Sequence, residues 1–373
     1  QEHPAPRYHA RDVALVRARN SDAVTLLTSA TPSIESYLNG IKKRFILLEL
    51  KKRYGQSQYP AVKLVDMKVE NKQTQNFNQT YSLELIDELS DCINRGEQAI
   101  VLQNRRGFAF IQRCRECGWV YECHQCSVTL TYHKVENRML CHYCNYATST
   151  ASTCPECKSL EIKFSGSGTQ KIENELQSLL PKARIIRMDM DTSRTRGAHY
   201  HILKKFGDHE ADILLGTQMI AKGLDFENVT LVGVINADVG LFMPDFRAGE
   251  RVFQLVYQVS GRSGRRKKQG KVIIQTYNPQ DIYVQAAARL DTKKFYNNSL
   301  AERNELFYPP FSRISRIVFS GMKKYAVEEL AIQVGDILRT GDFLTLGPSP
   351  APLERIQGQW RYQIVIKVNP KTP

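Results

Sequence analysis

Residues 212–236, DILLGTQMIAKGLDFENVTLVGVIN, contain two apolar runs, and the first run ends in Gly216 while the segment between the runs contains Gly223. The runs at 212–216 and 229–236 have the length and composition of buried strands. A short helix is expected between them, near residues 218–222. This stretch therefore predicts a strand–helix–strand unit, in which the two strands run parallel.

The same alternation continues on both sides of this unit. Further helices are expected at about 169–180, 195–206 and 248–259, and further strands at 99–102, 184–188 and 271–276. Strands that alternate with helices predict an α/β fold with a parallel sheet covered on both faces. Near the start, Val24 to Leu27 is predicted to be a strand that leads through a loop into a helix. Ser82 is a candidate N-cap for another helix.

We expect the 373 residues to divide into five segments, 1–55, 56–113, 114–160, 161–285 and 286–373. Asn and Gln are prominent from about residue 56 to residue 80, which favours a linker or long loop. Prolines at 309–310 and between 348 and 352 interrupt the last segment, which is expected to be a separate α+β domain.

The chain is basic, with 52 Lys and Arg against 38 Asp and Glu and a formal charge of +14. Its 42% hydrophobic and 24% charged residues describe a globular protein and exclude a disordered or fibrous one. It contains no apolar run long enough to span a bilayer and no basic-then-apolar leader, so we expect no membrane partner and a cytoplasmic location. The charge makes nucleic acid the first partner to consider, although a solvated basic surface would give the same value.

Eight of the nine cysteines form Cys-x-x-Cys pairs within 44 residues. Two residues between thiols allow one tight turn to present both sulfurs to a tetrahedral ion, and two such pairs complete its ligand shell. The pattern predicts two zinc ions, and four thiolates on each leave no open position for catalysis. Disulfides are disfavoured because nothing indicates an oxidising compartment. The pairs are Cys114/Cys117, Cys123/Cys126, Cys141/Cys144 and Cys154/Cys157.

Loop lengths favour a nested arrangement of these pairs. Only five residues separate the first two pairs, whereas fourteen separate the second from the third, which suits a small hairpin. The inner ligands would be Cys123, Cys126, Cys141 and Cys144, and the outer ligands Cys114, Cys117, Cys154 and Cys157. His124, His133 and His142 are alternative ligands by residue type, but the cysteines alone complete both shells.

Two glycine-containing segments are candidates for nucleotide or phosphate contacts. Residues 216–226 follow a strand and open a short helix, an arrangement that offers backbone N–H groups to an anion. In residues 258–265, QVSGRSGR, Arg262 and Arg265 stand three positions apart and are separated by a glycine. Two guanidinium groups on one side of a turn can neutralise charge on a departing γ-phosphoryl group. A basic loop facing solvent or nucleic acid would have the same composition.

These segments resemble the motifs of superfamily 2 helicases. Thr28-Ser29-Ala30-Thr31 is similar to motif III, residues 216–226 to motif V, and residues 258–265 to motif VI, Q-x-x-G-R-x-G-R. The resemblance narrows to the PriA family of bacterial replication-restart helicases through the eight-cysteine insertion and further segments, and it covers nearly the whole chain. Those segments are 6–12, 104–108, 245–251, 308–311 and 346–363.

The resemblance implies a RecA-like helicase lobe 2 with an inserted two-zinc subdomain, the tail of lobe 1, and a C-terminal α+β domain. It implies a 3′-to-5′ ATP-dependent DNA helicase that recognises stalled forks and reloads the replicative helicase. Forked, branched and single-stranded DNA, primosome proteins and single-stranded-DNA-binding protein would be its partners. ATP and Mg²⁺ would be the cofactors of the full-length protein, beside the two structural zinc ions.

The resemblance also implies roles for individual residues. Thr217 would contact a DNA phosphate, and Gly223 and Asp225 would lie near the nucleotide. Apart from the resemblance, Trp360 and Arg361 belong to a basic and aromatic stretch that suits branched or single-stranded DNA.

Residues of two further motifs would couple hydrolysis to movement. Gln258, Arg262 and Arg265 would link ATP to closure of the two lobes, with one arginine acting as the finger. Ser29 and Thr31 would link hydrolysis to the movement of DNA.

Two motifs of the family are missing from these residues. The chain has no G-x-x-x-x-G-K-[ST] phosphate loop and no Asp-Glu-x-His site, both of which precede Arg7 in the family. We therefore expect a fragment that does not hydrolyse ATP alone and whose C-terminal domain is truncated. The alternative is a non-catalytic, zinc-stapled module that binds DNA or a protein partner. The paired arginines discriminate between them, because such a module needs no γ-phosphate clamp.

Overall fold

The structure is a computed structural model, and it describes residues 8–50, 59–76, 79–103, 111–114, 121, 124, 130–133, 137–140, 146–160, 162–165, 169–189, 192, 197–217, 220, 226–237, 241, 246–263 and 269–370. None of the helices in these ranges is long and apolar enough to cross a membrane.

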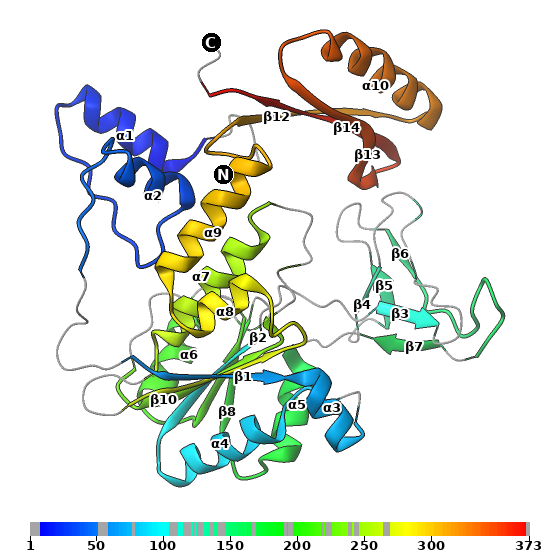
Figure 1. The fold of residues 1–373 in the computed structure, drawn as a ribbon. Coiled ribbons are helices and arrows are strands. Elements are labelled where there is room, and N and C mark those ends of the chain that lie inside the picture. Colours follow the sequence, from blue (N-terminus) through cyan, green and yellow to red (C-terminus); the bar gives the residue numbers. More distant parts are fainter. Residues whose placement is uncertain are drawn as a thin grey trace.

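The largest sheet in the described residues has six strands and is called the central sheet; it lies in the lower part of Figure 1. Its strands are β1 (Ala61–Asp66), β2 (Gln98–Gln103), β8 (Ile185–Met188), β9 (Ile213–Gly216), β10 (Val229–Ile235) and β11 (Lys271–Thr276). The order is β1-β11-β10-β2-β9-β8, and every neighbouring pair is parallel. Strands β2, β9 and β10 are buried along their whole length, which explains their apolar runs. The predicted parallel α/β sheet is confirmed.

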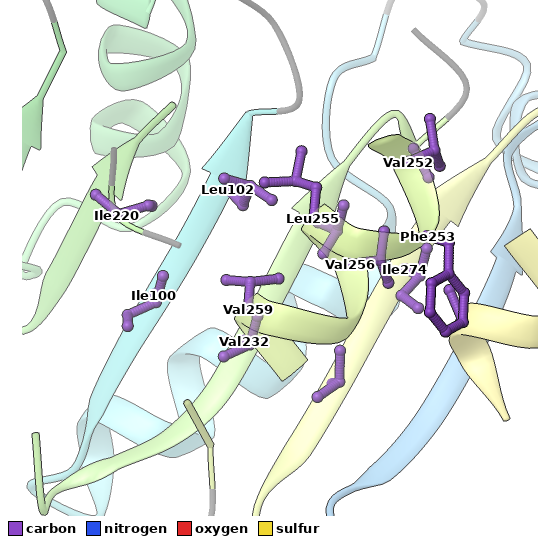
Figure 2. Packing of buried hydrophobic residues seen from close by; sticks show 14 of the residues in the cluster. Ile100, Leu102, Ile220, Val232, Val252, Phe253, Leu255, Val256, Val259 and Ile274 are labelled. Atoms are coloured by element: carbon purple, nitrogen blue, oxygen red, sulfur yellow. The ribbon is translucent and has the colours of Figure 1, made fainter. Parts of the chain in front are cut away.

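Helices cover both faces of this sheet. On one face lie α4 (Leu83–Asn94) and α5 (Thr169–Leu179), and on the other lie α6 (Ala198–Gly207), α7 (Ala248–Ser260) and α8 (Ile282–Ala288). Helix α9 (Thr292–Glu305) packs on α7 and α8 and extends away from the sheet. Alternate residues of β2 enter the two cores, with Ala99 and Val101 facing α4, and Ile100 and Leu102 facing α7. Figure 2 shows the α7 side, where apolar side chains of α7 pack on those of β2, β10 and β11.

The predicted cap of α4 is confirmed. The Ser82 hydroxyl accepts a hydrogen bond from the main-chain N–H of Leu85 at 3.2 Å. Gly96, just beyond the helix, adopts a φ of +68°, a conformation that glycine tolerates without strain. Cys92 is fully buried on the apolar face of α4.

Two sequence predictions are wrong in this part of the molecule. Residues 61–74, expected to belong to a linker, form β1 and α3 (Met67–Thr74), and β1 is an edge strand of the central sheet. Conversely, the predicted strand at Val24 to Leu27 has no strand structure, and Val24 and Leu26 are 97% and 76% exposed. A single extended segment is not stable as a strand unless a neighbour pairs with it.

The segments outside the central sheet are smaller. Near the start lie α1 (Ala10–Asn20) and α2 (Ile34–Ile41), the latter capped by Ser33 as its N-cap. The cysteine-rich region contains the two-stranded sheet β3 (Ile111–Cys114) with β7 (Ile162–Ser165), and the three-stranded sheet β4 (Thr131–His133), β5 (Arg138–Leu140) and β6 (Ala147–Thr148).

The last segment is an α+β unit, as predicted. An antiparallel sheet of order β12-β14-β13 contains β12 (Arg313–Gly321), β13 (Leu344–Ile356) and β14 (Gln359–Val368). Helix α10 (Lys324–Arg339) packs on this sheet, and α9 leads into it from the parallel-sheet domain (Figure 1).

Candidate functional site

Gln258, near the end of α7, contacts the segment that precedes α2. Its Nε2 donates a hydrogen bond to the hydroxyl of Thr31 at 3.2 Å. Thr31 is 4% exposed, and its main-chain N–H donates to the hydroxyl of Ser29 at 3.1 Å. The structure therefore brings together three predicted site residues, from the segments that resemble motifs III and VI.

A row of polar side chains on α7 extends this contact. Glu250, Gln254 and Gln258 are spaced four residues apart and so lie on the same face of the helix. Nε2 of Gln254 donates to Oε1 of Glu250 at 3.0 Å and to the main-chain oxygen of Thr31 at 3.5 Å. The apolar residues of α7 that pack on the sheet occupy other positions of the helix and are Val252, Phe253, Leu255, Val256 and Val259.

A buried ion cluster of Glu35, Glu250 and Arg303 lies at the start of this row, and sequence reasoning missed it. Nη2 of Arg303 is 2.5 Å from Oε2 of Glu250, and Nη1 is 3.0 Å from Oε1 of Glu35. Arg303 lies four residues after the buried Ser299 and seven after the buried Tyr296 on α9. Arg303 thus stands at a helical spacing from buried residues, and a charged residue in such a position was the sequence signal that could have revealed the cluster.

The two carboxylates of this cluster have opposite pKa shifts. Burial raises the pKa of Glu250, although the positive charge of Arg303 opposes the increase. For Glu35, burial also acts to raise the pKa, but a main-chain hydrogen bond and the charge of Arg303 outweigh it, so the pKa is lowered. Glu250 is therefore the carboxyl of the pair that holds a proton more readily.

Arg262 lies in the turn that ends α7. Its main-chain N–H donates to the oxygen of Val259 at 2.9 Å, and the buried hydroxyl of Ser263 donates to the oxygen of Ser260 at 3.2 Å. These bonds hold the start of the predicted arginine pair close to Gln258. The second arginine, Arg265, lies outside the described residues.

Thr217 directly follows the carboxyl end of β9 and is 8% exposed. Ligands of open parallel sheets bind at this edge, so the position suits a phosphate contact. A Cβ on the preceding Gly216 would lie 2.4 Å from the main-chain oxygen of Met188, which only glycine avoids. The other predicted residues of this segment, Gly223 and Asp225, lie outside the described residues.

The flanks of the predicted outer cysteine pairs lie together. Nε2 of Gln112 donates to the main-chain oxygen of Ala151 at 2.8 Å, and its Oε1 accepts from the N–H of Ala151 at 2.8 Å. Cys114 ends β3, and Cys154 is buried at the start of a turn in which Cys157 is exposed.

The flanks of the inner pairs are also joined, since β4 and β5 form an antiparallel hairpin between the second and third cysteine pairs. The cysteines Cys117, Cys123, Cys126, Cys141 and Cys144 lie outside the described residues. Those that are described have thiol chemistry and spacing that suit zinc.

Trp360 and Arg361 lie on β14, in the C-terminal α+β unit and away from α7 in sequence and domain. The Trp360 ring is flanked by two cations, Nζ of Lys324 at 4.8 Å and the guanidinium carbon of Arg355 at 5.0 Å from its centroid. Lys324 also pairs with Glu354 at 2.9 Å. A base that stacks on this ring would compete with these cations for the ring face that they occupy.

Three family descriptions match parts of the chain. The "Helicase conserved C-terminal domain" matches residues 149–267, the "PriA DNA helicase Cys-rich region (CRR) domain" residues 123–148, and the "Primosomal protein N C-terminal domain" residues 304–372. The replication restart protein PriA of Bacillus subtilis (strain 168) is 45% identical over 98% of this chain and 46% of its own length. The chain belongs to the PriA family.

Other PriA proteins match similarly. That of Chlamydia trachomatis serovar D is 44% identical over 85% of this chain and 42% of its own length. That of Borreliella burgdorferi is 37% identical over 96% of this chain and 54% of its own length. The chain thus spans about half the length of these PriA relatives. The predicted resemblance to PriA and the zinc-ribbon character of the cysteine-rich region are confirmed.

Among solved structures, RecG bound to a three-way DNA junction matches 74% of this chain and 27% of its own at 14% identity and a TM-score of 0.37. S. cerevisiae Dbp5 bound to RNA and ADP BeF3 matches 80% of this chain and 60% of its own at 12% identity and a TM-score of 0.37. TM-scores this low support no conclusion about the function of this PriA-family chain.

Proposed function

We propose that the protein containing this chain is an ATP-dependent 3′-to-5′ DNA helicase of replication restart, and that this chain supplies its second helicase lobe, the end of its first lobe and its C-terminal domain. Membership of the PriA family supports the class. The observation that carries the proposal is the hydrogen bond between Gln258 and Thr31, because it joins the two segments through which hydrolysis would be coupled to movement.

In this proposal the arginines after α7 act on ATP. Arg262 and Arg265 neutralise the charge that develops on the departing γ-phosphoryl group, a contribution worth on the order of 10³-fold or more in turnover. Gly223 and Asp225 lie near the nucleotide. Mg²⁺ and a phosphate loop would be supplied by parts of the protein outside this chain, so this chain alone turns over no ATP.

The DNA strand is held by other residues. Thr217 offers its hydroxyl to a backbone phosphate, and Ser29 and Thr31 transmit the closure of the lobes to the strand. Trp360 and Arg361 contact forked or single-stranded DNA from the C-terminal domain. Primosome proteins and single-stranded-DNA-binding protein are the proposed protein partners, and the cytoplasm the proposed location.

The cysteine-rich region holds two structural zinc ions in the nested arrangement. The paired hydrogen bonds between Gln112 and Ala151 support the outer site, because they join the flanks of its two cysteine pairs. The β4–β5 hairpin supports the inner site in the same way. Four thiolates around each ion would fix the fold of this small region and supply no catalytic chemistry.

The test compares Arg265→Ala with Arg266→Ala in the full-length protein. Both variants remove one positive charge from the same run, but only Arg265 belongs to the motif. We expect R265A to lose DNA-stimulated ATP turnover by about 10³-fold while DNA affinity stays within a few fold, and R266A to retain turnover. Full turnover in R265A would contradict the arginine role, and a wild-type protein without DNA-stimulated turnover would favour a non-catalytic module.

A further inference from the structure

Arg303 joins three segments that are far apart in sequence. It is 3% exposed on α9, and its guanidinium contacts Glu250 on α7 and Glu35 on α2. Nη1 also donates to the main-chain oxygen of Pro309 at 2.9 Å, at the start of the C-terminal α+β unit. One side chain therefore connects α7, the start of α2 just after the segment that resembles motif III (residues 28–31), and the chain that enters the last domain.

A second residue of α9 holds the same segment. The hydroxyl of Tyr296 donates to the main-chain oxygen of Pro32 at 2.7 Å, and its ring stacks on Tyr37 with centroids 3.8 Å apart. Tyr296 and Arg303 are seven residues apart, about two helical turns, and so lie on one face of α9. Figure 1 shows α2 beside α9. Helix α9 thus contacts residues 32–37 through two side chains, Tyr296 and Arg303.

A chain of hydrogen bonds leads from Arg303 to Gln258. Glu250 accepts from Arg303 and from Gln254, Gln254 reaches the main-chain oxygen of Thr31, and the Thr31 hydroxyl accepts from Gln258. All three α7 side chains are on the face that meets residues 31–35. This series of hydrogen bonds runs without a break from Arg303, which contacts the start of the C-terminal unit, to Gln258.

Buried ion pairs contribute little net stability, because the loss of hydration offsets the attraction between the charges. Apolar side chains of similar volume would hold α9 on α7 as well, as the parallel stack of Phe253 on Phe295 at 3.8 Å already does. The Arg303 cluster adds a fixed relative orientation of the side chains that it joins. The planar guanidinium fixes two carboxylates at set angles, which a lysine or an apolar residue does not do.

We infer that Arg303 is a positioning residue, which holds residues 29–37 against α7 in the arrangement where Gln258 reaches Thr31. Through this arrangement it links the C-terminal domain to the segment that resembles motif VI. Its effect on turnover rests on the proposed helicase function, whereas its effect on the position of residues 29–37 does not. Arg303 itself contacts neither nucleotide nor DNA in this role.

The first test measures hydrogen exchange of residues 29–37 in the full-length protein. The variant R303M/E250Q removes the guanidinium without leaving a buried unpaired carboxylate from α7, and K293M removes an exposed charge from the same helix as a control. We expect faster exchange of residues 29–37 in R303M/E250Q, on the order of tenfold, and no change in β2, β10 or in K293M. Unchanged exchange of this segment would overturn the inference.

The second test is a double-mutant cycle on DNA-stimulated ATP turnover. If Arg303 acts through Gln258, R303M lowers turnover on the order of tenfold in the wild-type background and much less in the Q258A background. Equal factors in both backgrounds would show that Arg303 only supports the fold and would overturn the link to motif VI. A wild-type protein with no turnover would instead refute the proposed function, and the exchange experiment would still decide the positioning role.

Discussion

The side-chain amide of Gln258 donates to the hydroxyl of Thr31 across 227 positions of sequence. Thr31 is almost fully buried, so the bond is shielded from water and its geometry depends on how residues 29–37 sit on α7. In the helicase that we propose, this bond would report whether residues 29–37 are correctly placed against α7.

Removing the Thr31 hydroxyl tests this bond directly. Thr31→Val keeps the shape of the side chain, and we expect DNA-stimulated ATP turnover of the full-length protein to fall roughly fivefold, the kinetic equivalent of one lost hydrogen bond. T31V combined with Q258A should cost little more than Q258A alone. Thr28→Val, at an exposed position of the same segment, is the control. Additive losses in the double variant would argue that the two residues act independently.

The ion pair between Arg184 and Asp212 gives the fold a pH dependence at the amino ends of β8 and β9. Nη2 of Arg184 is 2.5 Å from Oδ1 of Asp212, and the main-chain N–H of Arg184 donates to Oδ2 at 2.8 Å. Burial acts to raise the pKa of Asp212, but the hydrogen bonds and positive charge of Arg184 outweigh it and lower the pKa.

Because the folded pKa of Asp212 is depressed, its ionised form stabilises the fold above its unfolded pKa of about 3.9, and this contribution is lost as the pH falls through the folded value. We expect Asp212→Asn to lower the free energy of unfolding at pH 7 and to have much less effect at about pH 2. Urea unfolding at both pH values measures this, with Glu210→Gln as an exposed neighbouring control. An equal loss at both pH values would show that charge is not the cause.

The stack of Phe253 on Phe295 holds α9 on α7. The two rings are fully buried and parallel, with an interplanar angle of 1°. We expect Phe253→Ala to lower the free energy of unfolding by about 3–5 kcal/mol, through lost burial and the cavity that it leaves. Tyr200→Ala, at a position that is 67% exposed, should change it by less than about 0.5 kcal/mol. Denaturant titration of both variants decides the matter.

Zinc content tests the nested arrangement. Replacing Cys123, Cys126, Cys141 and Cys144 together by serine should remove one of two zinc equivalents, because the outer quartet keeps its four thiolates. The metal released on unfolding can be titrated with a chromogenic chelator. Loss of both equivalents, or of none, would contradict the nesting, and replacing Cys123, Cys126, Cys114 and Cys117 would then define the alternative sequential pairing.

A salt series of DNA binding separates the roles of Trp360 and Arg361. If a base stacks on the tryptophan, W360A should weaken binding by about 1–3 kcal/mol at every salt concentration without changing the slope of log K against log [salt]. R361A should reduce that slope by about 0.7–0.9 if it neutralises one phosphate. Tyr325→Ala, an exposed aromatic on α10, is the control. Unchanged affinity in W360A would leave the ring its contacts with Lys324 and Arg355 alone.

Local patterns in the sequence were sufficient for most of the sheet. Short apolar runs such as Val229 to Ile235 favour buried strands, and Ser82 marked the start of α4, because helix capping acts within a few residues. The Cys-x-x-Cys spacing indicated zinc for the same reason, since ligand geometry is set within a single turn.

Tertiary structure alone decided what depended on distant partners. β1 lies in an Asn- and Gln-rich stretch and is a strand because β11, more than two hundred residues later, pairs with it. Val24 to Leu27 has the composition of a strand but has no strand beside it in the described part of the chain. The sequence determined which segments resemble motifs III and VI, but the contact of Thr31 with Gln258, and the burial of Arg303 between Glu35 and Glu250, exist only because packing on the sheet brings α2, α7 and α9 together.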